Sequence, residues 1–135
     1  MPFDVSFPTR HTDTYATSGF VHAGVLLALT ELAYAAFESH CGIEKPAGVL
    51  AVPRETAVSY HRPLPWQDGC RVEVETTEVG EHGFSQEFVC YSRASDVRIA
   101  TFRHDWVWLD LSNGRPVPIP GDVQDRYRRG EATGE

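Results

Sequence analysis

The carboxylate of Glu31 has the most unusual setting of any charged group in this sequence. From Val25 to Phe37 every residue is apolar or small except Thr30 and Glu31. An ionised carboxylate is costly to bury in an apolar interior unless it has a partner, a shifted pKa or access to water. Glu31 therefore either points to solvent through a gap or belongs to a site that uses its charge.

A second group of interest lies where the same apolar stretch begins, in the segment Gly19-Phe-Val-His-Ala-Gly24. A helix that starts here leaves the backbone N–H groups of Ala23 and Gly24 without partners inside the helix. Such N–H groups attract negative charge and suit a developing oxyanion. The alternative is structural, with His22 simply capping the helix.

Small residues accompany Glu31 on one face of the expected helix. At about 100° per residue, Gly24, Ala28, Glu31 and Ala35 follow one another along a single stripe. Such a stripe admits another backbone or an extended ligand, but it also suits close packing across a dimer with Glu31 solvated or held by the second chain. Glu38 comes next on the stripe. A further alternative is therefore that the face carrying Glu31 is simply exposed to water. The opposite side carries residues that suit packing on a sheet: Leu26, Leu29, Ala33 and Phe37.

The whole chain reads as one globular domain. Its 135 residues are 41% apolar and 11% aromatic, enough for a substantial core. No apolar run reaches the roughly 20 residues of a membrane span, and the first residues lack the pattern of a signal peptide. The three cysteines are odd in number and have no CxxC spacing, which argues against a disulfide framework or a zinc site and favours a reducing cytoplasm.

The formal charge of −7 argues against nucleic acid as a partner, because lysine and arginine on phosphates dominate that kind of binding. A small anionic ligand is still compatible with this charge, since it needs only a few local arginines.

The order of expected elements predicts an α+β fold. An alternating strand at 2–7 and a polar loop at 8–21 lead into one long helix at about 22–40, and nearly everything after it reads as strand. A helix so apolar must be enclosed, so we expect an antiparallel sheet of five to six strands wrapped around one central helix. Open sheet edges predict pairing with a second copy. The later segments are strands at 49–63, 70–76, 84–92 and 97–111, a closing segment at 110–120, and a polar C-terminal tail at 121–135, frayed or forming a short helix.

Several motifs resemble the hot-dog-fold acyl-CoA thioesterases. His22-Ala23-Gly24, six residues and Glu31 resemble a His-Gly-Gly-x6-Glu/Asp signature. Thr12-Asp13-Thr14 is similar to the Asp-Thr-Asp region of the 4-hydroxybenzoyl-CoA thioesterase-like branch. Tyr60-His-Arg-Pro63 and the ending Val107-Trp-Leu-Asp110 continue the likeness, which covers about residues 3–120. The resemblance implies a single hot-dog domain over 1–120.

The resemblance also implies a mechanism for cleaving a thioester. Glu31 would act as base or nucleophile, with Asp13 as a second candidate carboxylate. His22 would orient the site or contact the substrate, and the amides of Ala23 and Gly24 would form the oxyanion hole. The alternative for Asp13 is a residue that caps its own loop.

By the same resemblance the substrate would be an acyl-CoA or acyl-carrier-protein thioester. We expect coenzyme A to lie along the interface of a homodimer, itself paired into a dimer of dimers. Coenzyme A would be part of the substrate, with no separate cofactor, no metal and no membrane partner. The residues expected to contact the substrate are Gly19, Thr30, Tyr60, Arg62 and Arg93.

Two other functions are compatible with these patterns. A hot-dog dehydratase or hydratase would need a proline at the helix start and an acid where Leu29 stands, so it ranks low. A non-catalytic protein that binds acyl thioesters is favoured if Glu31 is paired with an arginine and closed to solvent.

Overall fold

The computed structural model describes residues 2–15 and 17–133. The predicted order of strand, long helix and strands is confirmed, with element ends close to those expected. The elements in chain order are β1 (Phe3–Phe7), the 3-10 helix η1 (His11–Asp13), α1 (Ala23–His40), β2 (Val49–Tyr60), β3 (Cys70–Val79), β4 (Gly83–Ser92), β5 (Arg98–Asp110), β6 (Arg115–Pro116) and α2 (Gly121–Arg129).

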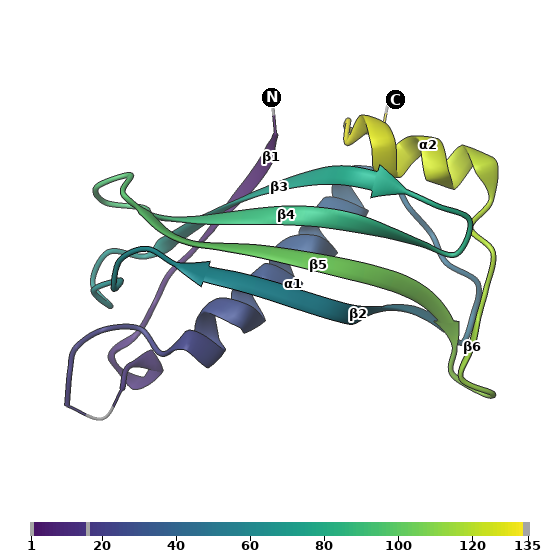
Figure 1. Ribbon diagram of the computed structural model, residues 1–135. Helices are drawn as coiled ribbons and strands as arrows, with labels where there is room; N and C mark the ends of the chain where they lie inside the picture. The colour runs from purple at the N-terminus through teal and green to yellow at the C-terminus, as the bar shows by residue number, and fades with distance from the viewer. Residues whose placement is uncertain (1, 16, 134–135) are drawn as a thin grey trace.

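The strands form one antiparallel sheet of six, in the order β1-β3-β4-β5-β2, with β6 paired to the end of β5. Although β2 and β3 follow each other along the chain, they lie on opposite sides of the β4–β5 hairpin. The pairing of β2 with β5 shifts register between Pro53 and Glu55, since proline has no N–H to donate to a neighbouring strand and is confined to bulges and edge strands. The sheet curves around α1, which crosses its inner face as predicted (Figure 1).

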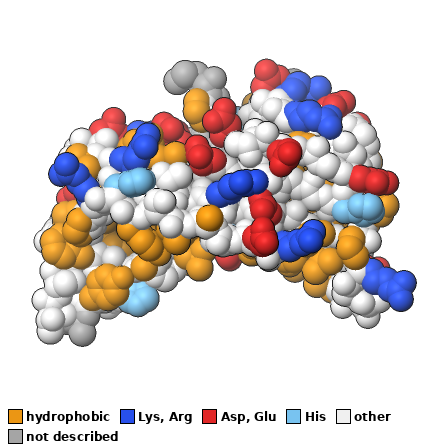
Figure 2. All heavy atoms as spheres, viewed as in Figure 1, with side chains coloured by type: hydrophobic (Ala, Val, Ile, Leu, Met, Phe, Trp, Pro, Cys, Tyr) orange, Lys and Arg blue, Asp and Glu red, His pale blue; other side chains and the backbone are white. Residues whose placement is uncertain are grey.

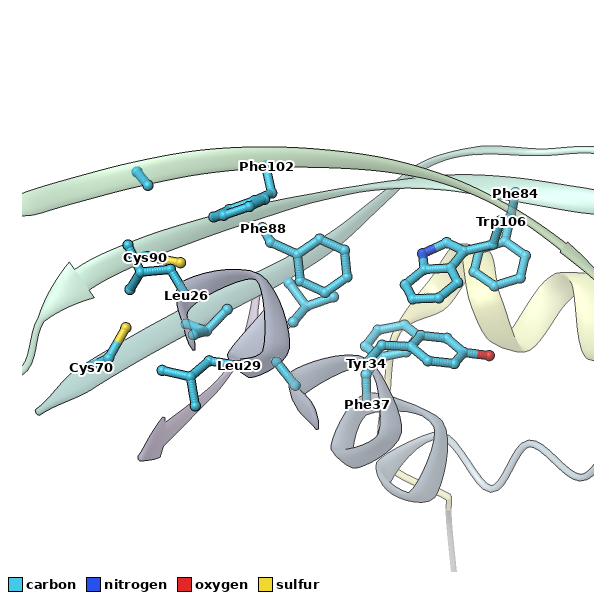
Figure 3. Packing of buried hydrophobic residues seen from close by; sticks show 14 of the residues in the cluster. Leu26, Leu29, Tyr34, Phe37, Cys70, Phe84, Phe88, Cys90, Phe102 and Trp106 are labelled. Atoms are coloured by element: carbon cyan, nitrogen blue, oxygen red, sulfur yellow. The ribbon is translucent and has the colours of Figure 1, made fainter. Parts of the chain in front are cut away.

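The core lies between α1 and this inner face. As the helical spacing predicts, Leu26, Leu29, Ala33 and Phe37 are all buried. Tyr34 stacks on the ring of Trp106, with 4.4 Å between ring centroids. Figure 3 shows the side chains of α1 pointing toward those of the central strands: Phe84, Phe88, Phe102 and Trp106.

One face of α1 and the edge strand β2 stay uncovered in a single chain. Leu27 and Leu32 on the helix are 37% and 55% exposed, and Val58 and Tyr60 on β2 are 40% and 56% exposed. Figure 2 shows hydrophobic side chains along the hollowed lower rim of the molecule. The expectation of a fully enclosed helix is therefore wrong for one chain, because the sheet covers only one side of it.

For the polar tail predicted to begin at residue 121, the short helix is the alternative that the structure shows. Residues 121–129 form α2, and Tyr127 on it is fully buried. Its hydroxyl oxygen accepts a hydrogen bond from Nε1 of Trp108 at 3.0 Å and lies 2.8 Å from that of Tyr34. The segment is thus part of the same domain and completes its core. Within the described residues, no helix is both long and apolar enough to cross a membrane.

A polar side chain, His104, also lies in the core. It is fully buried on β5 between Phe102 and Trp106. Its ring nitrogens lie 2.8 Å from Oγ1 of Thr30 on α1 and 2.8 Å from Oγ1 of Thr56 on β2. Burial lowers the pKa of His104 from 6.5 to about 4, against a smaller opposing effect of Asp105.

Replacing Tyr127 by phenylalanine should test whether α2 belongs to the core. The variant leaves Nε1 of Trp108 and the hydroxyl of Tyr34 short of a buried partner, so the free energy of unfolding should fall by about 1–3 kcal/mol. Urea denaturation measures this. Tyr91→Phe is the matched control, since the Tyr91 hydroxyl makes only a 3.4 Å contact with Glu73. Equal effects of the two variants would contradict the role of Tyr127.

Acid should destabilise the protein through His104. Its folded-state pKa lies below its unfolded value, so its contribution to stability is complete above pH 6.5 and is lost as the pH falls from 6.5 to about 4. The loss should reach about 3 kcal/mol. Urea midpoints from pH 7 to pH 4 should fall less steeply in His104→Gln, which does not titrate there. Identical slopes would rule out this contribution.

Candidate active site

His22 caps the N-terminus of α1. Its Nδ1 accepts a hydrogen bond from the backbone N–H of Gly24 at 2.8 Å, which is the structural alternative considered for this residue. A Cβ at position 24 would stand 3.0 Å from that same nitrogen, so glycine keeps the cap in place. The N–H of Ala23 donates to the hydroxyl oxygen of Tyr15 at 3.2 Å. Both amides predicted for the oxyanion hole therefore already have partners in this chain.

Asp13 is held close to this helix end. Its backbone carbonyl accepts from the N–H of His22 at 2.8 Å, and Thr14 and Val21 form a bridge beside it. Its carboxylate accepts from the N–H of Arg10 at 2.8 Å, so it caps η1, as the structural alternative predicts. The side chain of Asp13 is 16% exposed and reaches solvent on the side of α1.

A groove of about 610 Å³ runs from this point along α1. Asp13, His22 and Gly24 line one end, and the helix surface at Ala28 and Leu32 continues it. The structure thus brings three of the predicted site residues together, with a carboxylate and a helix N-terminus at one end of an apolar groove. An anionic or carbonyl group could meet polar partners there while an apolar group lies along the helix.

Glu31 is not among the residues that line this groove, although Gly24 and Ala28 on the same stripe of α1 are. It is exposed on α1, on the uncovered face that also carries Ala28 and Ala35. The predicted stripe therefore exists and faces outward. It ends before Glu38, whose carboxylate accepts a hydrogen bond from the hydroxyl of Tyr34 at 2.6 Å and pairs with Lys45. Glu38 is thus not a marker of a solvated face.

A second pocket, of about 310 Å³, lies on the other side of the helix start. Its walls include Ala23, Tyr60 and Arg62, together with the rings of Tyr15 and Phe20. Two of the residues predicted to contact substrate, Tyr60 and Arg62, are therefore exposed at a pocket next to the N-terminus of α1.

The other three predicted substrate residues lie elsewhere. Gly19 shapes the loop, with a φ of +76° that favours glycine, and its carbonyl accepts from the N–H of Trp66. Arg93 is exposed beyond β4, and its N–H donates to the carbonyl of Gly69. Thr30 is fully buried, so the predicted contact of Thr30 with substrate is wrong for this chain. Neither pocket is lined by any of the three.

Two residues were not predicted from the sequence: Tyr15, which contacts the N–H of Ala23, and His104, which contacts Thr30 on α1. The alternation along the predicted strand 97–111 puts His104 on the same face as Phe102 and Trp106, which would have marked it as an inward polar residue. No comparable signal singled out Tyr15 in a polar loop. Among the described residues, no group of three or more His, Cys, Asp and Glu side chains is arranged to hold a metal ion.

Comparisons with known proteins agree with this architecture. The sequence model of the thioesterase-like superfamily matches residues 9–127. No curated protein matches the chain significantly. Among solved structures, a thioesterase from Thermus thermophilus in complex with coenzyme A and zinc is 25% identical, over 95% of this chain and 92% of that one, with a TM-score of 0.78.

Two more distant structures show the same fold. A 1,4-dihydroxy-2-naphthoyl-CoA thioesterase from Synechocystis is 17% identical over 94% of this chain and 96% of its own, with a TM-score of 0.81. A DHNA-CoA thioesterase from Staphylococcus aureus is 12% identical over 93% and 88%, with a TM-score of 0.83. With its hot-dog fold and a family match over most of its length, the chain belongs to the thioesterase-like superfamily.

Proposed function

We propose that this protein hydrolyses an acyl-CoA thioester to the free acid and coenzyme A. The observation that carries the proposal is the groove at the start of α1, where the carboxylate of Asp13 lies beside His22 and Gly24. Family membership supports thioester chemistry, and the relative crystallised with coenzyme A supports that carrier.

The proposed reaction needs a carboxylate, a water molecule and donors for the oxyanion. The carboxylate takes a proton from water while the water oxygen bonds to the thioester carbonyl carbon. The carbonyl oxygen becomes an oxyanion, which N–H groups at the start of α1 stabilise. The C–S bond then breaks, and the leaving sulfur takes the proton from the carboxylic acid. For the N–H of Ala23 to bind the oxyanion, its hydrogen bond to the hydroxyl of Tyr15 has to break first.

Two carboxylates are candidates for the base, and the geometry weights them differently. Within one chain Asp13 is better situated, because it lines the groove with the helix N-terminus. Glu31 can act either as the base or as the nucleophile that attacks the carbonyl directly. It needs a second chain to enclose it, since its face of α1 is exposed.

We further propose that the working unit is a homodimer, paired into a dimer of dimers. A second copy would cover the exposed apolar residues on α1 and β2, of which Leu32 and Tyr60 are more than half exposed. Coenzyme A would then lie between the chains, with its phosphates on Arg62 and Arg93. An acyl-carrier-protein thioester is the alternative carrier.

A non-catalytic role in binding acyl thioesters is the second candidate. It is favoured by the partners that the amides of Ala23 and Gly24 already have and by the bond between the Asp13 carboxylate and the N–H of Arg10.

The three cysteines are buried free thiols, which fits the proposed cytoplasmic location.

A thiol-release assay with short-chain, long-chain and aryl-CoA thioesters tests the proposal. We expect the wild type to release coenzyme A from at least one class. Asp13→Asn should lower kcat by about 100-fold to 10,000-fold, because removal of a general base costs that much, and Glu31→Gln should lower it if that residue acts in the shared site.

Glu44→Gln is the control, since Glu44 is exposed and lies outside both pockets. Equal activity in all variants would contradict both assignments. Binding of acyl-CoA with no thiol release would support the binding role instead.

A charge on the exposed face of α1 should separate the chains. We expect the wild type to have at least twice the 15.1 kDa mass of one chain by light scattering. Leu27→Glu should give a monomer without activity, because a buried unpaired carboxylate opposes association.

The matched control is Leu111→Glu. Leu111 is 59% exposed and follows β5, at the end of the sheet away from the start of α1 (Figure 1). A fully active wild-type monomer would contradict the shared site, and dissociation by both variants would show a non-specific effect.

A further inference from the structure

We infer that His104 is a positioning residue, which holds α1 and its site residues in place against the edge strand β2 through hydrogen bonds to Thr30 and Thr56. The inference deepens the proposed function and rests on it where activity is the readout. It concerns residues that line neither of the two pockets described above.

The hydrogen bonds fix the tautomer of His104. The hydroxyl of Thr30 donates its proton to the carbonyl of Leu27 at 2.7 Å, so toward His104 this oxygen can only accept. Nε2 of His104, 2.8 Å away, therefore carries the proton and donates it to Thr30. Nδ1 is then the acceptor and receives the proton of the Thr56 hydroxyl at 2.8 Å. The chain of bonds runs in one direction, from β2 through the imidazole to α1.

Aromatic rings leave this imidazole little freedom. The ring centroids of Phe88 and Trp106 lie 5.1 Å from that of His104, and the ring of Phe102 lies at 6.0 Å. His104 itself is fully buried, so no water competes for its nitrogens. The bridge therefore links two elements through a rigid group.

Each end of the bridge lies on an element that also carries residues of the proposed site. Thr30 directly precedes Glu31, and Thr56 shares a face of β2 with Tyr60, which lines the pocket beside the helix start. Apolar packing sets no precise position along or around a helix, because it is not directional. A hydrogen bond has a preferred distance and angle. The bridge thus supplies the directional contact between α1 and the uncovered edge of the sheet.

A purely structural role predicts a different result from a positioning role. If the bridge only satisfies buried polar groups, its loss lowers stability but leaves kcat per folded molecule unchanged. If it positions α1, its loss lowers kcat at unchanged folding, since a displacement of about 1 Å can cost on the order of 100-fold.

The test compares Thr30→Val, Thr56→Val and the double variant under conditions where each is folded. Each single variant should lower kcat about 10-fold or more, with KM within about twofold. Thr30→Ser keeps the hydroxyl and should restore kcat to within about threefold of wild type. The double variant should lose less than the product of the two single losses, because one bridge is broken in both.

Val74→Ala is the matched control. Val74 is a fully buried core residue on β3, 1% exposed, and its truncation lowers stability without touching the bridge. Unchanged kcat in both Thr→Val variants, or a loss in Val74→Ala equal to theirs at matched stability, would overturn the inference. Independent, multiplicative losses in the double variant would also overturn it.

Two measurements test the bridge without an activity assay. They separate a failure of this inference from a failure of the proposed function. Ring ¹⁵N shifts of His104 should show the Nε2–H tautomer. Hydrogen exchange at the amides around Glu31 should quicken in Thr30→Val and not in Val74→Ala. The Nδ1–H tautomer, or equal protection in the two variants, would overturn the inference even if the wild type cleaves thioesters.

Discussion

One helix is too narrow to cover the sheet that surrounds it. Neighbouring strands lie about 4.8 Å apart, so the five strands side by side in this sheet span about 20 Å from axis to axis, whereas a helix with its side chains is about 10–12 Å wide. α1 therefore covers only part of the inner face. α2 closes part of the remainder through Tyr127, which packs on Phe37 and Phe84. The side toward β2 is left open.

The candidate site lies along this unfinished side. The groove, the pocket at Tyr60 and the exposed carboxylate of Glu31 all border the part of α1 that the sheet does not cover. A single chain thus combines a rigid, aromatic centre with an apolar flank that exposes polar groups to a ligand or a second chain. The buried core and the exposed flank have one cause: the sheet is wider than α1, so the strands bury one side of the helix and leave the other side uncovered.

Features set by local periodicity were predictable from the sequence. Alternation located the strands, and helical spacing separated the buried side at Ala33 and Phe37 from the outward stripe at Gly24 and Ala35. The sheet order was not predictable in this way, since β1 pairs with β3 across a long stretch of chain. Tyr127 was missed because its neighbours are charged, and a single apolar side chain in a polar segment gives no periodic signal.

The site was predictable in part. The motifs pointed first to Glu31, with His22, Gly24 and Asp13. The fold brings the last three together at one groove, whereas Glu31 lies on the exposed face of α1. The spacing could not reveal that Tyr15 occupies the N–H of Ala23, because that contact depends on how a loop folds back. Thr30 was expected by resemblance to contact the substrate. It is adjacent to the exposed Glu31, but adjacent residues on a helix point about 100° apart, and this rotation carries Thr30 into the core.

The burial of Tyr127 also bears on how the protein folds during its synthesis. Chains emerge from the ribosome N-terminus first, at about 5–20 residues per second. Until residue 127 emerges, Nε1 of Trp108 and the hydroxyl of Tyr34 lack the partner that they share in the finished core. A nascent chain that has not yet reached residue 127 therefore holds the aromatic rings of its core without the hydroxyl that links Trp108 to Tyr34.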